Sequence, residues 1–133
     1  MEQALYGIMV GSGNEAANAV AEHVSGSIEG FVDLMNEKAK SLGLTQTHFA
    51  NVNGLHMDNH YTTAYDLAII AAEFFKSPAL SEIGGCARYH FERSKTQPDD
   101  FYITNKHKLI TGEIACEGVI GGKTGFTDEA GEC

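Results

Sequence analysis

The sequence contains no long hydrophobic run. None of its apolar stretches approaches the roughly 20 residues that a helix needs to cross a bilayer, which excludes a membrane-spanning helix within it. A positively charged segment followed by a hydrophobic one is also missing, so we expect no export signal within this chain.

Positive charge is scarce. Lys and Arg number 9 against 18 Asp and Glu, and the formal net charge at pH 7 is −9. This excess of negative charge repels the phosphates of nucleic acids and the headgroups of anionic lipids. We therefore expect neither nucleic acid nor an anionic membrane surface as a partner.

Cysteine is rare as well. The 3 cysteines, Cys86, Cys116 and Cys133, are widely spaced and form no CxxC pair. An odd number without close spacing argues against a disulfide framework and against a structural zinc site. Because Cys133 ends the chain, we expect the sequence to be a piece of a longer protein.

The sequence does contain enough apolar material for a folded core. Hydrophobic residues make up 43% of the 133 positions, which suits one domain of ordinary size or part of a larger one. Apolar residues at helical spacing predict helices over residues 2–10, 14–24, 27–42, 63–76 and 78–83. The predicted buried face of the fourth helix consists of Ala64, Leu67, Ala68, Ala71 and Phe75.

The pattern changes after residue 85. Aromatic and alternating residues predict strands over 88–93 and 101–104, and a third strand over 118–127. Helices first and strands later are typical of an α+β fold. We expect a helical lobe at about residues 1–85 and a few antiparallel strands at about 86–133.

A long loop is predicted over residues 45–61, which lack a sustained period and are rich in Asn, Asp and Gly. Within it, His56, Asp58 and His60 have the composition of a metal site. On a loop such side chains more often hydrogen-bond to nearby backbone, and we favour that interpretation. We expect no metal and no cofactor.

Two short motifs are candidates for function. Ser12-Gly13-Asn14 interrupts two predicted helices, where it is either a simple helix cap or a polar pair facing a cleft. Lys123-Thr124-Gly125 places an ammonium with three donors between glycines, which suits an anionic ligand. A phosphate-binding P-loop is disfavoured, because Glu117 occupies the place of its first glycine and no helix is predicted to follow.

Together these motifs resemble the second and third signature motifs of the penicillin-recognising serine enzymes. The similarity is greatest to the low-molecular-mass D-alanyl-D-alanine carboxypeptidases, which are penicillin-binding proteins of peptidoglycan metabolism. The stretches that carry it are 9–17, 21–23, 31–39, 42–44, 47–49, 51–55, 61–67, 104–106, 121–127 and 130–131. This resemblance implies part of a β-lactamase/transpeptidase-like fold.

One family motif is absent from these residues. The family's nucleophile is the serine of Ser-x-x-Lys, and no Ser, Thr or Cys here is followed by Lys three positions later. We therefore expect an internal fragment of the catalytic domain that is inactive by itself. A class of β-lactamase with a Glu-assisted water is also disfavoured, because no Glu-x-x-Leu-Asn lies between the two motifs.

The resemblance implies roles for the remaining motifs. Ser12 would relay a proton to the leaving amine, and Asn14 would orient the missing lysine and the substrate amide. Lys123 and Thr124 would hold the terminal carboxylate, and the strand from Gly125 onward would offer backbone N–H groups. The implied partners are stem peptides ending in D-Ala-D-Ala and, for the parent protein, β-lactam antibiotics.

Three further expectations complete the interpretation. The parent protein is expected to be extracytoplasmic. The chain is expected to self-associate through an open sheet edge and an uncovered lobe face. The alternative functions are a non-catalytic peptidoglycan-peptide binding module and a β-lactamase-related hydrolase.

Overall fold

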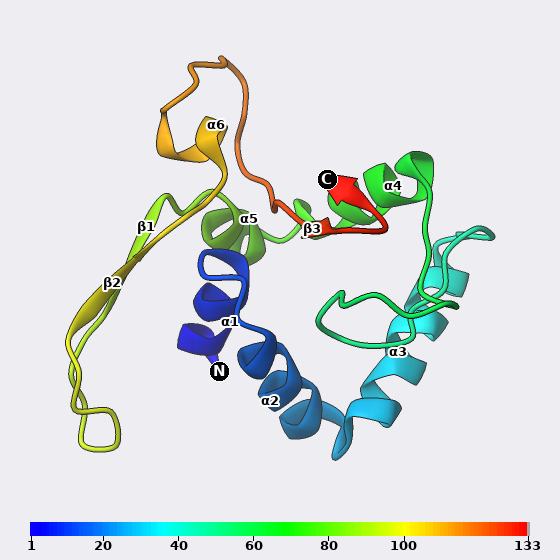
Figure 1. Cartoon of the computed structure of the whole chain (residues 1–133), viewed down its shortest axis with the longest axis horizontal. Helices are drawn as coiled ribbons and strands as arrows, with labels where there is room; N and C mark the ends of the chain where they lie inside the picture. The colour runs from blue at the N-terminus through cyan, green and yellow to red at the C-terminus, as the bar shows by residue number, and fades with distance from the viewer. Residues whose placement is uncertain (133) are drawn as a thin grey trace.

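Helices form most of the body of the molecule, and two short pairs of strands extend from it (Figure 1). The computed structural model describes residues 1–132. Its elements are α1 (Glu2–Met9), α2 (Asn14–Ser25), α3 (Ile28–Ser41), α4 (Ala64–Phe74), α5 (Pro78–Gly84), β1 (Arg88–Phe91), β2 (Phe101–Thr104), α6 (Lys108–Thr111), β3 (Phe126–Thr127) and β4 (Gly131–Glu132). None of the helices in this range is long and apolar enough to cross a membrane.

The helices begin and end where local chemistry predicts. Ser27 caps α3 by accepting the backbone N–H of Gly30 at 3.0 Å, and Thr63 caps α4 by accepting that of Asp66 at 3.1 Å. Gly26 ends α2 with φ 82°, a left-handed conformation that favours glycine. The predicted helices over residues 14–24, 27–42 and 63–76 are confirmed to within two residues at their ends.

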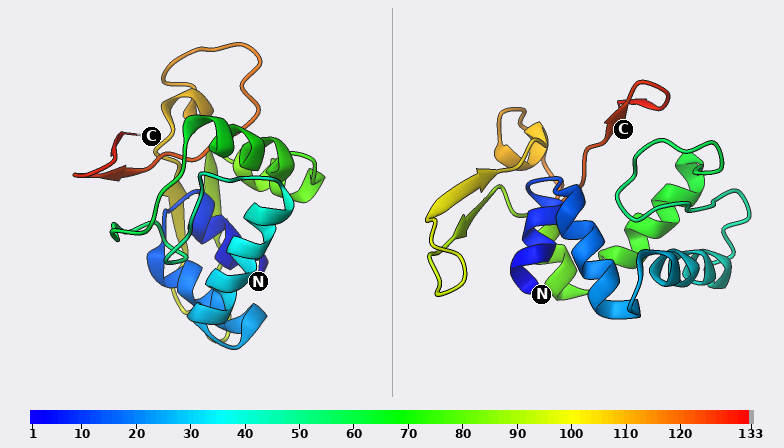
Figure 2. Two further views of the ribbon diagram at one scale, coloured as in Figure 1. Left: turned by 90° about the vertical axis from the view of Figure 1, so that its right-hand side faces the viewer. Right: turned by 60° about the horizontal axis from the view of Figure 1, so that its bottom comes forward.

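The core lies where α1, α5 and the β1–β2 hairpin meet. Tyr6, Val10 and Ile83 are buried together, and the ring of Tyr6 stacks on that of Tyr89 at 3.8 Å. Helices α1, α2 and α3 pack in chain order beside this core. Both predicted strands of the hairpin are present and antiparallel, with Tyr89 opposite Ile103, although the first ends at Phe91, two residues earlier than predicted. The hairpin projects from the body (Figure 2).

The predicted buried face of α4 is wrong. Ala64, Leu67, Ala68 and Ala71 are exposed, and Phe75 is only half-buried. The buried residue of this helix is Asp66, whose carboxylate accepts the Gln46 N–H at 3.1 Å and the Thr47 hydroxyl at 2.7 Å. The preceding loop is therefore bound to the polar side of α4, and the apolar side is left open within residues 1–132.

The predicted strand over residues 118–127 is also wrong for most of its length. Only Phe126–Thr127 pairs as a strand, with β4. The segment before it contacts the end of α5 instead, and the Gly122 N–H donates to the Gly84 carbonyl oxygen at 3.1 Å. A Cβ at Gly121 would lie 2.8 Å from the carbonyl carbon of Gly84, so glycine permits this close approach.

The predicted loop over residues 45–61 is confirmed as ordered. His48 and Tyr61 form an isolated antiparallel bridge that closes it. Asn36 on α3 pairs with the Phe49 backbone through two bonds of 2.8 Å, one in each direction. These bonds hold the loop against α3.

Candidate functional site

The two candidate motifs line one open groove of about 1030 Å³. Ser12 and Asn14 contribute from the junction of α1 and α2, and Lys123, Thr124 and Gly125 from the segment before β3. The other lining residues are Ile8, Asn53, Gly54, Leu55, Lys106, His107, Lys108, Leu109, Phe126, Thr127, Ala130 and Glu132. The fold thus brings together residues that are far apart in the sequence.

The Ser12 wall has an unusual backbone. Ser12 has φ 55°, a left-handed conformation that is uncommon outside glycine and that often marks functional sites. Its N–H donates to the Ile8 carbonyl oxygen at 3.0 Å, which holds the turn on the end of α1. The N-cap of α2 is Gly13, without a side-chain cap bond, so simple capping does not explain the polar pair. Within residues 1–132 the Ser12 hydroxyl and the Asn14 amide make no hydrogen bond to the chain.

The Lys123 wall carries positive charge. The Lys123 ammonium donates to the carbonyl oxygen of Thr124. Partial burial lowers the pKa of Lys123 below its usual 10.5, and the nearby charge of Lys106 lowers it further. An anion bound between these two ammonium groups would relieve their repulsion.

The two sequence motifs do not include a basic segment that lies beside Lys123. Lys106, His107 and Lys108 line the groove, and none of the three forms an ion pair within the described range. Asn105 positions them: its buried amide donates to the Cys86 carbonyl oxygen at 3.0 Å, and its Oδ1 accepts the His107 N–H at 2.9 Å. The signal for this segment in the sequence is Thr104-Asn105-Lys106, one of the stretches that carry the family resemblance. The resemblance implies no role for these three residues.

A third wall of the groove comes from the loop tip at residues 51–55, of which Asn53, Gly54 and Leu55 line the cavity. The Asn51 side chain accepts the Gly54 N–H at 2.7 Å and donates to the Leu55 carbonyl oxygen at 2.7 Å. The Asn53 amide contacts Asn18 of α2 at 3.4 Å. The loop tip is therefore shaped by its own asparagines and presents Leu55 to the groove.

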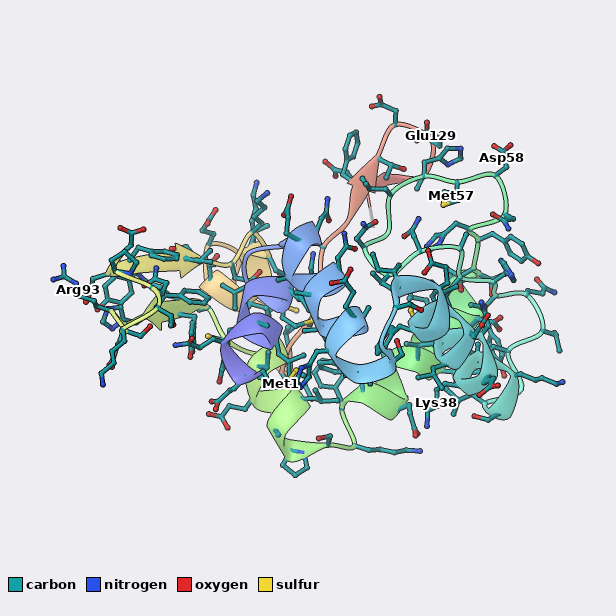
Figure 3. The ribbon with its side chains drawn as sticks, turned by 90° about the horizontal axis from the view of Figure 1, so that it is seen from below. Met1, Lys38, Met57, Asp58, Arg93 and Glu129 are labelled. Carbon is teal, nitrogen blue, oxygen red and sulfur yellow. The ribbon has the colours of Figure 1, made fainter. Side chains whose placement is uncertain are left out.

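His56, Asp58 and His60 make separate contacts, one of them to the distant β3–β4 turn. His60 Nδ1 accepts the Ala50 N–H at 3.0 Å, while His56 lies 3.8 Å from Asp58 and 4.0 Å from Glu129. Figure 3 shows Glu129 of the β3–β4 turn on the same side as Met57 and Asp58 of the loop. Among residues 1–132, no group of three or more His, Cys, Asp or Glu side chains could hold a metal ion.

Solved structures that superpose on this chain include DD-transpeptidases, a D-alanyl-D-alanine carboxypeptidase and penicillin-binding proteins. A mutant of the Streptomyces K15 DD-transpeptidase superposes with a TM-score of 0.90 and 30% identity, over 98% of this chain and 53% of that one. A D-alanyl-D-alanine carboxypeptidase from Mycobacterium tuberculosis H37Rv gives 0.85 and 32%, over 99% of this chain and 48% of that one. The α+β, transpeptidase-like fold is thereby confirmed.

Sequence comparison leads to the same class of protein as the solved structures. The model of the D-alanyl-D-alanine carboxypeptidase family, Peptidase_S11, matches residues 1–133, so the chain belongs to that family. DacF of Bacillus subtilis is 41% identical over 133 residues, covering 100% of this chain and 33% of its own length. DacA of Escherichia coli K12 is 32% identical over 131 residues, covering 98% and 30%. The chain therefore spans about a third of these curated relatives.

Proposed function

We propose that this chain supplies two walls of the active site of a serine-type D-Ala-D-Ala carboxypeptidase. The observation that carries the proposal is the shared groove, in which Ser12 and Asn14 line the same cavity as Lys123. The substrate is a peptidoglycan stem peptide ending in D-Ala-D-Ala, and the whole protein works outside the cytoplasm.

In the proposed reaction, a serine hydroxyl attacks the carbonyl carbon between the two terminal D-alanines. The hydroxyl oxygen forms an ester bond, the peptide C–N bond breaks, and the released D-alanine amine takes a proton. Water then hydrolyses the ester and restores the hydroxyl. Ser12 relays the proton to the leaving amine, and Asn14 orients the substrate amide.

The terminal carboxylate binds at the basic end of the groove. Lys123 offers a charge-assisted hydrogen bond, and Thr124 adds a hydroxyl beside it. Gly125 leaves the backbone open for a closely approaching peptide. Lys106 supports this assignment, because its charge already acts on Lys123.

Peptide binding tests these assignments. The 133-residue chain is titrated with an acyl-D-Ala-D-Ala peptide, and the Lys123→Met variant is expected to lose at least about tenfold in affinity, as for a charge-assisted bond. Lys95→Met is the matched control, since Lys95 is exposed in the hairpin turn away from the groove. Equal loss in both variants would reject the assignment.

Acylation requires a nucleophile that these 133 residues do not show. No hydroxyl or thiol residue has Lys three positions later, so we expect no covalent labelling of this chain by a fluorescent penicillin. In a longer chain with a Ser-x-x-Lys upstream, labelling is expected and should vanish when that serine becomes alanine. A peptide-binding module without catalysis is the second candidate, favoured if such a chain binds peptide but is never labelled.

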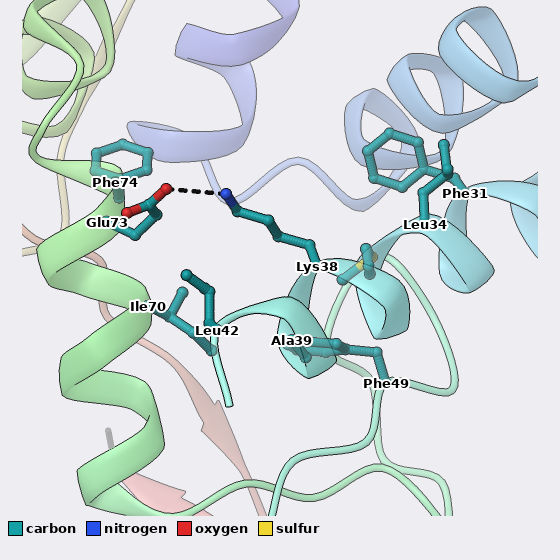
Figure 4. Close-up of a pocket in the computed structure, with 10 residues that line it drawn as sticks. Phe31, Leu34, Lys38, Ala39, Leu42, Phe49, Ile70, Glu73 and Phe74 are labelled. Atoms are coloured by element: carbon teal, nitrogen blue, oxygen red, sulfur yellow. Dashed lines mark hydrogen bonds and ion pairs between the residues drawn. The ribbon is translucent and has the colours of Figure 1, made fainter. Parts of the chain in front are cut away.

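Self-association is the remaining proposal. An apolar groove of about 360 Å³ lies between α3 and α4, bordered by the Lys38–Glu73 ion pair (Figure 4). Leu34 in this groove and Leu67 on α4 are 46% and 47% exposed. We expect light scattering to detect dimers or larger species, reduced by Leu34→Glu but not by Leu55→Glu. A monomer at all concentrations would reject this.

A further inference from the structure

Phe126 exposes an unusual amount of apolar surface at the groove. Its side chain is 67% exposed, although it is a large aromatic residue in a strand. A single exposed apolar residue needs no explanation. Phe126, however, lines the groove directly after Lys123-Thr124-Gly125, and Leu55, 54% exposed, lines it from the loop tip.

Phe126 and Leu55 belong to two walls that approach each other. Phe126 is held in β3 by pairing with Glu132 of β4. The turn between these strands carries Glu129, whose carboxylate lies 4.0 Å from the imidazole of His56, the residue after Leu55. The loop tip and the β3–β4 hairpin are thus neighbours, with an apolar side chain from each in one groove.

The groove has a basic part and an apolar part. Lys106 and Lys123, whose charges interact, make the first, and Phe126 and Leu55, on neighbouring segments, make the second. Ile8, Leu109 and Ala130 line the groove as well. A ligand that matches both parts has a carboxylate at one end and an apolar group further along. An extended peptide advances about 3.3 Å per residue, so the third residue from its carboxyl end lies roughly 7–10 Å from the carboxylate. Phe126, three positions after Lys123, is within about the same reach.

We propose that Phe126 determines specificity by contacting an apolar or long alkyl side chain on the third residue from the carboxyl end of the bound peptide. Leu55 contacts the same side chain from the neighbouring loop tip. This inference rests on the proposed function, since it requires the peptide carboxylate at Lys123. Substrates with a small third residue would keep the carboxylate contact and lose the apolar one.

The test compares two peptides, acetyl-Leu-D-Ala-D-Ala and acetyl-Gly-D-Ala-D-Ala, by calorimetric titration of the 133-residue chain. The leucine peptide is expected to bind about tenfold more tightly, as partial burial of a leucine side chain allows. Phe126→Ala should reduce this preference to about twofold or less, whereas Phe126→Leu should retain most of it. Phe101→Ala is the matched control, because Phe101 is an exposed phenylalanine of the β1–β2 hairpin, outside the groove.

The outcomes separate the two proposals. If Phe126→Ala keeps the full preference while Lys123→Met weakens both peptides, the Phe126 inference is overturned and the proposed function stands. If Lys123→Met changes neither affinity, the proposed function fails first. If the chain binds neither peptide under conditions where its circular dichroism is that of a folded protein, both are rejected.

Discussion

The backbone N–H of Gly122 donates to the carbonyl oxygen of Gly84 across 3.1 Å. This bond joins the segment that carries Lys123 to the end of α5, and α5 packs in turn against α1, which leads to Ser12. The Ser12 wall and the Lys123 wall of the groove are therefore connected through α5. Disturbing the glycine contact should affect both folding and the groove.

Gly121→Ala should destabilise the chain. The added methyl would lie 2.8 Å from the Gly84 carbonyl carbon and 2.8 Å from the Phe75 ring, so backbone must move, at a cost of roughly 1–3 kcal/mol. Gly7→Ala is the control. Its methyl, on α1, would meet Ala16 of α2 at an ordinary 3.6 Å, and the variant should gain up to about 1 kcal/mol of helix propensity. Urea unfolding measures both. Equal free energies of unfolding for the two variants would contradict the close packing of Gly121 against Gly84.

Acid should weaken the fold through His60. Burial lowers the pKa of His60 below its ordinary 6.5, and the charges of His48 and His56 lower it further. The unfolded chain then binds a proton at His60 more readily than the folded chain does. The contribution of His60 to the free energy of unfolding is therefore complete above about pH 6.5 and is lost as the pH falls toward the pKa of His60 in the folded chain. Unfolding free energy measured from pH 8 to 5 should show this loss in the wild type.

Two variants isolate the His60 effect. His60→Asn should have a shallower pH dependence over this window, because the titrating ring is gone. His23→Asn should follow the wild type, since His23 is exposed on α2. If His60→Asn and the wild type have the same slope, another group is responsible.

The Glu73 carboxyl should titrate far below ordinary glutamates. Hydrogen bonds from Lys76 and then Lys38, with their charges, lower the pKa of Glu73 from 4.5 to about 2. Lys76→Met and Lys38→Met should each raise the pKa of Glu73, because each variant removes one hydrogen bond and one positive charge. Side-chain carboxyl NMR during a pH titration measures it. Added salt should raise the pKa in the wild type as well.

Removing Lys106 should raise the pKa of Lys123 without restoring it fully. Partial burial is the larger cause of the lowered pKa and remains in Lys106→Met. The NMR titration of the Lys123 ε-methylene should therefore end below 10.5 in this variant. Lys95→Met should leave the pKa of Lys123 unchanged. If Lys95→Met changed this pKa as much as Lys106→Met, the ammonium groups of Lys106 and Lys123 would not be specifically coupled.

The Ser12 and Lys123 motifs were visible in the sequence, but their neighbours were not. A pair of motifs can be recognised from residue order and spacing. Lys106 could not be assigned to Lys123 in that way, because their proximity depends on Asn105 and on the contact between Gly122 and α5. The roles of Ser12, Asn14, Lys123, Thr124 and Gly125 stay predictions, as does the division into a lobe and a sheet near residue 85. The state of Cys133 lies outside the described residues.

The sequence alone determined the ends of α1 to α5 to within two residues, the β1–β2 hairpin and the family, but not the short helix α6. These features depend on interactions within a few residues, such as the Ser27 cap and the left-handed Gly26, or on a direct match of residue order. Tertiary structure decided which side of α4 stays open and where Lys123 lies. Both follow from contacts between distant segments, in which Asp66 binds the preceding loop and Gly122 binds α5, and no local pattern encodes such contacts.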